Sequence, residues 1–238
     1  MDSKIRAAQE QVLAVFSKEA VDFALAGGTA LELYYLHHRF SSDLDFFSPN
    51  YDPSQIQRLI EAFKKRLHKR VRLESELMVG GKAKVRFYTM PLKGSNRPLK
   101  IDFVEDVLFK KPDIRTVKGV RVYSAENIYL QKIAAISGTQ AVVDDIGREI
   151  TEGRREARDV FDLFMLSKKI QPLHAFLRRA PVPWQKGMVH WYRTFSRQEL
   201  KLALMDMDIY NPRFNSREMV QYLEGQIQQF AKTVIEAA

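Results

Sequence analysis

At 238 residues, 45% of them hydrophobic, the chain is long enough to bury the core of one large domain or two small ones. It contains no cysteine, which excludes disulfides, thiolate-bound zinc and thiol catalysis and leaves oxygen ligands or histidine for any metal. Lys and Arg outnumber Asp and Glu by 38 to 29, and the formal net charge of +9 is typical of proteins that bind nucleic acids.

The N-terminal residues show no targeting signal. Residues 1–11 lack the apolar segment of a signal peptide, and no run in the chain approaches the roughly eighteen apolar residues that a membrane span requires. We therefore expect a cytoplasmic protein without a membrane partner. Residues 3–20 are predicted to form an amphipathic helix, to which we assign packing and no other role.

Residues 21–47 are predicted to form a strand, a glycine turn, a helix and a second strand. The apolar residues 23–26 are typical of a short buried strand, and Gly27 and Gly28 let the backbone turn sharply and approach a ligand closely. Thr29 then stands at the expected N-cap of a helix over residues 29–38, where free N–H groups and the helix dipole favour an anion. The turn is therefore a candidate phosphate-binding element.

Two carboxylates end this stretch. Within a strand, Asp43 and Asp45 point to the same face, while Leu44 and Phe46 point to the opposite, apolar face. Neighbouring carboxylate oxygens are the ligands that hard divalent cations prefer. The pattern predicts a metal site, with magnesium as the first choice.

The middle of the chain supplies a third candidate carboxylate. A helix over residues 53–69 and a hairpin of residues 71–79 and 83–92, turning at Gly80-Gly81, precede a strand over residues 99–106. Within that strand Asp102 lies between Ile101 and Phe103, where a carboxylate is costly to bury unless a cation accompanies it. Glu105 and Asp106 are the alternatives, but both are expected at the surface where the strand ends.

The C-terminal half is predicted to be mainly helical. A strand and turn lead into a helix that begins after Ser124 and contains Lys132. Residues 137–153 are irregular, and the following helix over residues 154–169 places Asp159 and Asp162 on one face. Taken alone, Lys132 is as consistent with an ordinary exposed lysine as with a functional one.

Taken together, these motifs resemble a known family. The turn Gly27-Gly28-Thr29, followed by the run from Arg39 through Ser41 and Asp43 to Asp45, is similar to the signature of DNA polymerase beta-like nucleotidyltransferases. More narrowly it resembles the AbiEii type of nucleotidyltransferase toxin, whose pattern is Gly-Gly-Ser/Thr and then Arg-x-Ser-x-Asp-x-Asp. The structural alternative is a βαβ turn with a surface Asp-x-Asp edge.

The resemblance implies a fold and a division of the chain. The fold is α+β, a polymerase beta-like mixed β-sheet with flanking helices followed by a C-terminal helical domain. Residues 1–123 would form the nucleotidyltransferase catalytic domain, and residues 124–238 the helical domain that contributes the second half of the active site. Within the latter, Lys132 and the Arg-Asp-x-x-Asp-Leu element around Asp159 match the family pattern, although their separation is longer than is typical.

The resemblance also implies roles for individual residues. Three carboxylates would hold two Mg²⁺ ions, with Mn²⁺ as the alternative metal. Backbone and side-chain groups of the turn and of the motif would bind the nucleotide, and Asp159 would orient Lys132 or aid deprotonation. The implied catalytic residues are Asp43, Asp45, Asp102, Lys132 and Asp159, the metal ligands are Asp43, Asp45 and Asp102, and the nucleotide-binding residues are Gly27, Gly28, Thr29, Arg39, Ser41 and Lys132.

The implied activity is transfer of a nucleoside monophosphate from an NTP to an acceptor. Resemblance to toxins of toxin–antitoxin pairs makes tRNA or another RNA the leading acceptor and a cognate antitoxin protein a possible partner. Two alternatives remain: a nucleotidyltransferase that modifies a small molecule or a protein, and an inactive nucleotidyltransferase-like module that binds RNA or a partner.

Overall fold

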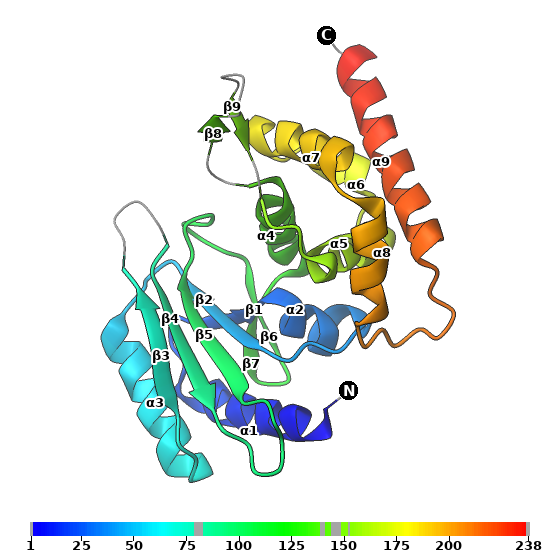
Figure 1. The fold of residues 1–238 in the computed structure, drawn as a ribbon. Helices are drawn as coiled ribbons and strands as arrows, with labels where there is room; N and C mark the ends of the chain where they lie inside the picture. The colour runs from blue at the N-terminus through cyan, green and yellow to red at the C-terminus, as the bar shows by residue number, and fades with distance from the viewer. Residues whose placement is uncertain (1, 79–82, 139–140, 144–148, 152, 237–238) are drawn as a thin grey trace. The chain divides into compact units, whose positions relative to one another are not determined.

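The computed structural model describes residues 2–78, 83–138, 141–143, 149–151 and 153–236 (Figure 1). The chain divides into two compact units, one formed by Met1–Tyr35 and Phe40–Asn127, the other by Leu36–Arg39 and Ile128–Ala238. Four residues of the N-terminal motif region therefore belong to the second unit. Within the described ranges, no helix is both long enough and apolar enough to cross a membrane.

The first unit is built on a mixed β-sheet. Strands β2 and β5 run parallel, as do β1 and β7, whereas the remaining neighbours are antiparallel. This arrangement confirms the predicted α+β fold with a mixed sheet. The strands, in the sheet order β3-β4-β5-β2-β1-β7-β6, are β3 (Arg72–Leu77), β4 (Val85–Met90), β5 (Leu99–Glu105), β2 (Leu44–Ser48), β1 (Ala24–Ala26), β7 (Val120–Tyr123) and β6 (Ile114–Val117).

One face of this sheet packs against helices α1 (Ser3–Glu19) and α3 (Pro53–Leu67) (Figure 1). The side chains of Leu44 and Phe46 on β2 are fully buried on this face, and the Phe46 ring stacks on Phe16 of α1 with centroids 4.1 Å apart. Because successive side chains of a strand alternate between faces, Asp45 projects away from these helices.

The helix that follows β1 differs from the expected one. It begins as α2 (Gly27–Ala30), with Ala26 as its N-cap, and continues as the π-helix η1 (Leu31–Leu36). The prediction of Thr29 as N-cap of a helix over residues 29–38 is therefore wrong. The physical reason is Gly27, whose φ of +67° turns the chain from the strand directly into the helix.

The second unit is mainly helical, as predicted, with one short hairpin. The hairpin falls within residues 137–153, which the sequence predicts to be irregular. Two acidic residues of that segment, Asp144 and Asp145, lie outside the described residues. In the first unit, the predicted Gly80-Gly81 turn also lies outside them. The elements are α4 (Ala125–Ser137), β8 (Ala141–Val143), β9 (Glu149–Thr151), α5 (Ala157–Lys169), α6 (Leu173–Leu177), α7 (Val182–Thr194), α8 (Arg197–Met205) and α9 (Ser216–Glu236).

The segment Leu36–Arg39 is tied into this second unit by backbone contacts. Arg39 forms a β-bridge with Ile209, and the Tyr210 N–H donates to the carbonyl oxygen of His38 at 3.0 Å. The His38 ring also stacks on Phe161 of α5, with centroids 5.5 Å apart. The side chains of His38 and Arg39 are thereby held against α5.

Candidate functional site

The structure brings two of the predicted carboxylates together. Asp45 on β2 lies directly beside Asp102 on β5, in the register of the parallel strands. Their strand neighbours Ile101 and Phe103 are fully buried on the opposite, helix-covered face. Residues that are partners in register share a face of the sheet, so both carboxylates project from the face that α1 and α3 do not cover.

Glu105 and Asp106, the alternatives to Asp102 as the third carboxylate, interact with other residues. Glu105 pairs in register with Ser48, and its carboxylate forms an ion pair with Lys84 at 2.9 Å. Asp106 is buried, contrary to the expected surface position, and accepts a hydrogen bond from the Tyr123 hydroxyl at 2.7 Å. Neither carboxylate is placed beside Asp45.

Asp43 is held through its main chain. It lies one residue before β2, so the alternation expected within a strand does not determine where its side chain points. Its carbonyl oxygen accepts hydrogen bonds from the Thr29 hydroxyl and, at 3.5 Å, from Gln9, while its carboxylate accepts one from Ser42 at 3.1 Å.

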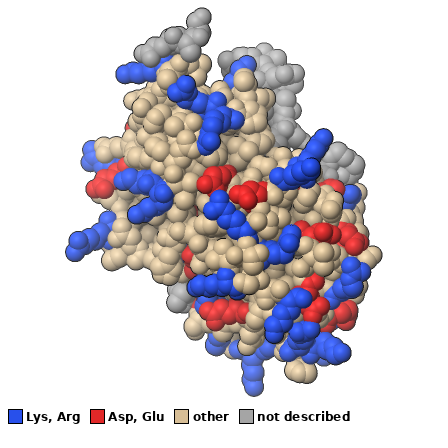
Figure 2. Space-filling model, turned by 180° about the vertical axis from the view of Figure 1, so that it is seen from behind, with Lys and Arg blue, Asp and Glu red and all other residues tan. Residues whose placement is uncertain are grey.

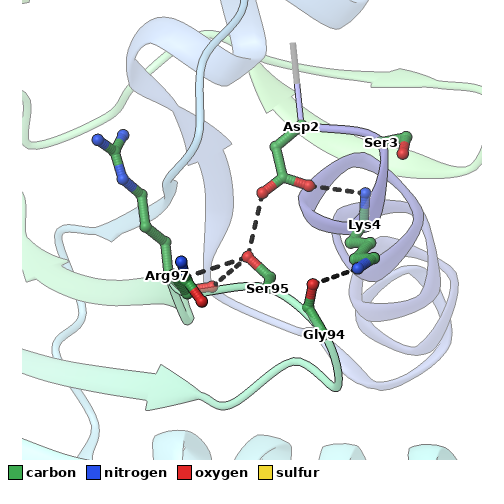
Figure 3. A pocket seen from close by; sticks show the side chains of 7 residues that line it. Asp2, Ser3, Lys4, Gly94, Ser95 and Arg97 are labelled. Atoms are coloured by element: carbon green, nitrogen blue, oxygen red, sulfur yellow. Dashed lines mark hydrogen bonds between the residues drawn. The ribbon is translucent and has the colours of Figure 1, made fainter.

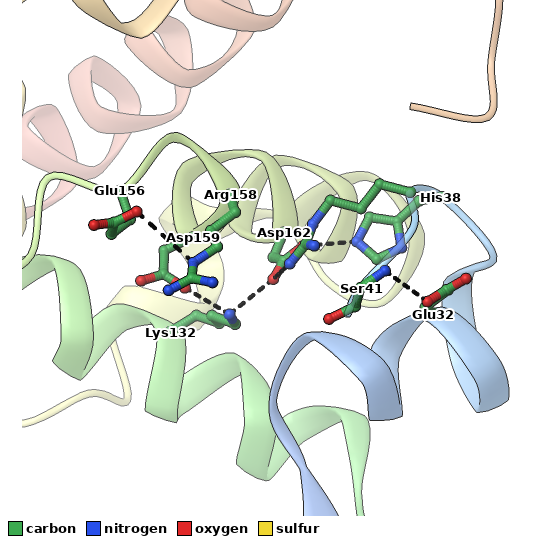
Figure 4. Close-up of polar contacts among 9 residues, drawn as sticks. Glu32, His38, Ser41, Lys132, Glu156, Arg158, Asp159 and Asp162 are labelled. Carbon is green, nitrogen blue, oxygen red and sulfur yellow. Dashed lines mark hydrogen bonds and ion pairs between the residues drawn. The ribbon is translucent and has the colours of Figure 1, made fainter. Parts of the chain in front are cut away.

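Ser41, two residues before Asp43, is held by hydrogen bonds with η1 and α1. The Ser41 N–H donates to Glu32 at 2.8 Å (Figure 4). Gln9 donates to the Ser41 carbonyl oxygen at 2.9 Å. Glu32 also forms a buried ion pair with Arg6 of α1. We call the contacts of Gln9, Thr29 and Glu32 with residues 41–43 the loop clamp. The clamp sets the start of β2 and hence the position of Asp45.

The glycine turn lies against Asp45. Gly27 has a φ of +67°, and a Cβ atom on it would lie 3.1 Å from Cγ of Asp45 and closer still to Oδ2. The position therefore needs glycine both for its backbone angle and for space. Gly28, the next residue, is buried. The predicted turn and one predicted metal ligand are thus neighbours.

The carboxylates fit a magnesium ion only in part. Among the described residues there is no group of three or more His, Asp or Glu side chains arranged to hold a metal. Mg²⁺, however, is commonly bound by one or two carboxylates together with substrate phosphates and water. The adjacent carboxylates of Asp45 and Asp102 satisfy that smaller requirement.

In the second unit, Lys132 lies in a buried cluster of charges (Figure 4). Its ammonium is 2.6 Å from Asp159 and 2.7 Å from Asp162, which both extend from α5. Arg39 binds both oxygens of Asp162 at 2.7 Å, and the His38 ring is also 2.7 Å from that carboxylate. We call these five residues the Asp162 cluster.

In this cluster, attraction between opposite charges affects the pKa values more than burial does. Burial opposes ionisation of Asp162, but Lys132 and Arg39 hold its pKa well below the usual range. Burial likewise opposes charge on Asp159, whose pKa is lowered by Lys132 and Arg154. The pKa of Lys132 is lowered by burial but raised more strongly by the two carboxylates. All three groups are therefore charged at neutral pH.

A comparison with models of protein families matches most of this chain to one family. The family model "Nucleotidyl transferase AbiEii toxin, Type IV TA system" matches residues 11–232. The chain belongs to the AbiEii family. It is accordingly a nucleotidyltransferase that uses an NTP, and its membership of a type IV toxin–antitoxin family implies an antitoxin partner.

Two solved structures share the fold of this AbiEii-family chain. A proposed nucleotidyltransferase from H. pylori is 18% identical, with a TM-score of 0.62 over 100% of this chain and 99% of that one. JHP933 from Helicobacter pylori is also 18% identical, with a TM-score of 0.59 over 98% of this chain and 92% of that one. No curated protein matches the sequence at a significant level.

A surface pocket of about 450 Å³ has none of the predicted site residues in its lining (Figure 3). It is formed by the start of α1 and the loop between β4 and β5. Its polar groups bond within the lining: Ser95 donates to Asp2 at 3.1 Å, and Lys4 donates to the Gly94 carbonyl oxygen. The predicted function assigns no role to this pocket.

The sequence assigns no role to three buried residues of the candidate site. Gln9 and Glu32 lie outside the motifs, and Asp162 is the second Asp of the Arg-Asp-x-x-Asp-Leu element. The helix over residues 3–20 is predicted to contribute packing alone, yet Gln9 within it is fully buried and donates a hydrogen bond to the loop before β2. Glu32 and Asp162 are also buried and bonded to cations. The available signal for Gln9 was a polar side chain on the apolar face of an amphipathic helix. The partners of Glu32 and Asp162 lie far away in the sequence.

Gly27→Ala is expected to impair transfer more than folding. The methyl group would displace the Asp45 carboxylate, and misplacement by about 1 Å can cost roughly a hundredfold in rate. Gly119→Ala is the matched control, since Gly119 has a φ of +80° but nothing within 4 Å of its Cβ position. Both variants should lose about 1–2 kcal/mol of unfolding free energy from the positive φ. Equal activities of the two variants would contradict the role of Gly27 beside Asp45.

The Asp162 cluster predicts stability losses at both ends of the pH range. Carboxylates with lowered folded-state pKa values stabilise above the ordinary value of 3.8, and this contribution is lost as the pH falls below it. Lys132, whose pKa is raised, stabilises below 10.5 and loses its contribution as the pH rises further. Denaturant unfolding followed by tryptophan fluorescence reports this unit, because both tryptophans lie in α7. A stability that stays constant below pH 4 would contradict the assignment.

Proposed function

We propose that this AbiEii-family enzyme transfers a nucleoside monophosphate from an NTP to an RNA, with tRNA as the leading acceptor. The reaction would depend on Mg²⁺ and take place in the cytoplasm, where NTPs and tRNA are found. The observation that carries the proposal is the placement of Asp45 beside Asp102, with Gly27 against the Asp45 carboxylate.

The metal would be held by Asp45 and Asp102. The family resemblance adds Asp43, which forms no three-ligand group with them among the described residues. Mg²⁺ bound there would neutralise triphosphate charge and lower the pKa of the acceptor hydroxyl. Mn²⁺ prefers the same oxygen ligands and would substitute for it. The protein's part is positioning: the β2–β5 register holds the two carboxylates side by side, and the loop clamp fixes the residue where β2 begins.

The glycine turn would receive the phosphates. Gly27 and Gly28 have no side chains to obstruct a triphosphate, and the turn brings the backbone close to Asp45. Thr29, expected from the sequence to bind phosphate, donates its hydroxyl proton to the Asp43 carbonyl oxygen and is fully buried. We therefore assign Thr29 a positioning role. Ser41 remains a proposed nucleotide contact.

The residues of the second unit keep the roles that the resemblance implies. We propose that Lys132 contributes positive charge to the reaction and that Asp159 orients its ammonium, as the 2.6 Å contact between them supports. Arg39, also a proposed nucleotide contact, binds Asp162 through both carboxylate oxygens. Both cations are thus pre-oriented by carboxylates.

The charge balance supports an RNA acceptor. The formal net charge of +9 favours binding of a polyanion. Figure 2 shows Lys and Arg spread over the face drawn, with fewer acidic side chains between them. Phosphate contacts by such residues give affinity without sequence specificity. The charge therefore supports nucleic acid as a class of acceptor.

Incubation with each labelled NTP, Mg²⁺ and total tRNA tests the proposal. We expect label in tRNA, lost with a chelator and restored by Mg²⁺ or Mn²⁺. Parallel reactions contain a small-molecule panel or a protein mixture. Label appearing only in one of these would refute the RNA acceptor, and no transfer to any acceptor would refute the proposed reaction in favour of a binding module.

A further inference from the structure

A row of side chains crosses the sheet on the face that carries the carboxylates. In register from the β3 edge, Phe87 on β4 pairs with Asp102, Asp102 pairs with Asp45, and Asp45 pairs with Ala26 at the end of β1. The sheet order in Figure 1 shows these four strands side by side. Partners in register have Cβ atoms about 4.5–5.5 Å apart. Phe87 is therefore the immediate neighbour of Asp102.

Phe87 is unusually accessible for an aromatic residue. The residue is 37% exposed, whereas its strand neighbours Tyr88 and Met90, whose side chains point to the opposite face, are 4% and 1% exposed. Among the residues that the structure describes, it is the only exposed Phe, Tyr or Trp. The ring is thus available to a flat ligand beside the carboxylates.

The surroundings of Phe87 suit a nucleotide. Lys100 lies two residues before Asp102 on β5, so it shares the carboxylate face, and its side chain is exposed. On β4, Thr89 is its partner in register and lies two residues beyond Phe87. An aromatic ring with a cation beside it is the combination that binds a base and its phosphate in single-stranded nucleic acids.

The position of Phe87 along the row favours the acceptor over the NTP. The glycine turn, to which we assign the triphosphate, adjoins Asp45 on the β1 side of the carboxylates. Phe87 adjoins Asp102 on the opposite, β4 side. A nucleoside stacked on Phe87 would therefore lie across the carboxylates from the triphosphate, as the acceptor of a transfer reaction must.

We propose that Phe87 is the platform on which the terminal base of the RNA acceptor stacks. This inference rests on the proposed function, because it takes Asp45 and Asp102 as the reacting centre and RNA as the acceptor. Stacking of one base on an aromatic side chain contributes a roughly five- to hundredfold gain in affinity. Phe87 would contribute that gain through substrate binding and leave the carboxylates untouched.

A binding experiment tests the stacking directly. Two short RNA oligonucleotides are compared, one ending in adenosine and the other in an abasic ribose. The wild-type protein should bind the first at least about fivefold more tightly, Phe87→Ala should bind both equally, and Phe87→Trp should restore the preference. Leu73→Ala is the matched control: Leu73 is 49% exposed on the same hairpin but pairs with Tyr88, so it lies on the opposite face.

Steady-state kinetics distinguish whether Phe87 binds the RNA acceptor or the NTP. With RNA as acceptor, Phe87→Ala should raise the KM for RNA and leave the KM for NTP unchanged. A rise only in the KM for NTP would refute the assignment to the acceptor, and an unchanged preference for the base-bearing oligonucleotide in Phe87→Ala would overturn the stacking site. Base-dependent binding through Phe87 without any label transfer to RNA would instead refute the proposed function and leave the stacking site standing.

Discussion

Asp45→Asn is expected to reduce nucleotidyl transfer by about a thousandfold or more. The substitution preserves the shape of the side chain but removes the charge that, beside Asp102, would hold the metal. Loss of that ligand forfeits several kcal/mol of stabilisation of the developing charge, and about 4 kcal/mol corresponds to a factor of a thousand. The measurement is the initial rate of label transfer from NTP at saturating Mg²⁺.

Folding should be almost unaffected by the same substitution. Two adjacent carboxylates repel each other, and removing one charge relieves this repulsion, so the thermal midpoint should change little. Asp113→Asn is the control, because Asp113 is an exposed carboxylate of the same unit, ion-paired with Arg115. A large fall in the midpoint of Asp45→Asn would make the carboxylate structural, and retained activity would remove Asp45 from the reaction.

In cells, the family predicts a further readout of the same variant. Expression of the wild-type chain without an antitoxin should arrest growth, and Asp45→Asn should relieve the arrest at an equal protein level. The immunoblot that establishes equal levels excludes relief through degradation. Arrest by both forms would show that toxicity does not depend on transfer.

Asp162→Ala is expected to cost about 3–5 kcal/mol of unfolding free energy. The substitution leaves the Arg39 guanidinium and the Lys132 ammonium buried with one carboxylate fewer, and removing one partner of a buried ion pair typically costs this much. Total stabilities of domains are about 5–15 kcal/mol, so a large share of the second unit's stability depends on one carboxylate. Urea unfolding followed by tryptophan fluorescence measures the change.

An exposed ion pair of the same unit provides the comparison. Glu224→Ala removes the partner of Arg197 at a site where both side chains are partly exposed to water, so we expect a loss of about 1 kcal/mol or less. Asp162→Asn, which keeps the size of the side chain, should fall near the alanine variant because charge matters more than volume here. Similar losses for Glu224→Ala and Asp162→Ala would show that the Asp162 cluster does not stabilise the unit through charge.

Local patterns were sufficient to predict the elements that meet at the carboxylates. The glycine turn, the short apolar strands and the acids at alternating positions are features of neighbouring residues, which secondary structure converts directly into a shared face. Asp102 was chosen over Glu105 and Asp106 because it lies in the middle of an apolar strand, and the β2–β5 register places it beside Asp45. The catalytic roles of Asp45 and Asp102 stay predictions, and Asp45→Asn tests the first of them.

Other features depend on contacts between side chains that are far apart in the sequence. The contact of Arg39 with Asp162 joins residues 123 positions apart, and no periodicity relates them. Thr29 was assigned to a helix N-cap from its residue type, but the positive φ of Gly27 starts the helix earlier and turns the hydroxyl toward Asp43. Side-chain partners of this kind depend on how distant segments pack.

The amino-acid sequence by itself determined the α+β class, the mainly helical second half and the family, because hydrophobic periodicity, turn residues and a short motif are all local properties of the chain. The tertiary structure alone decided that Leu36–Arg39 belongs with the helices, that Thr29 and Glu32 hold the loop before β2, and that Phe87 stands beside Asp102. These depend on strand register and on the burial of paired charges, which are settled only when residues far apart in the sequence come into contact.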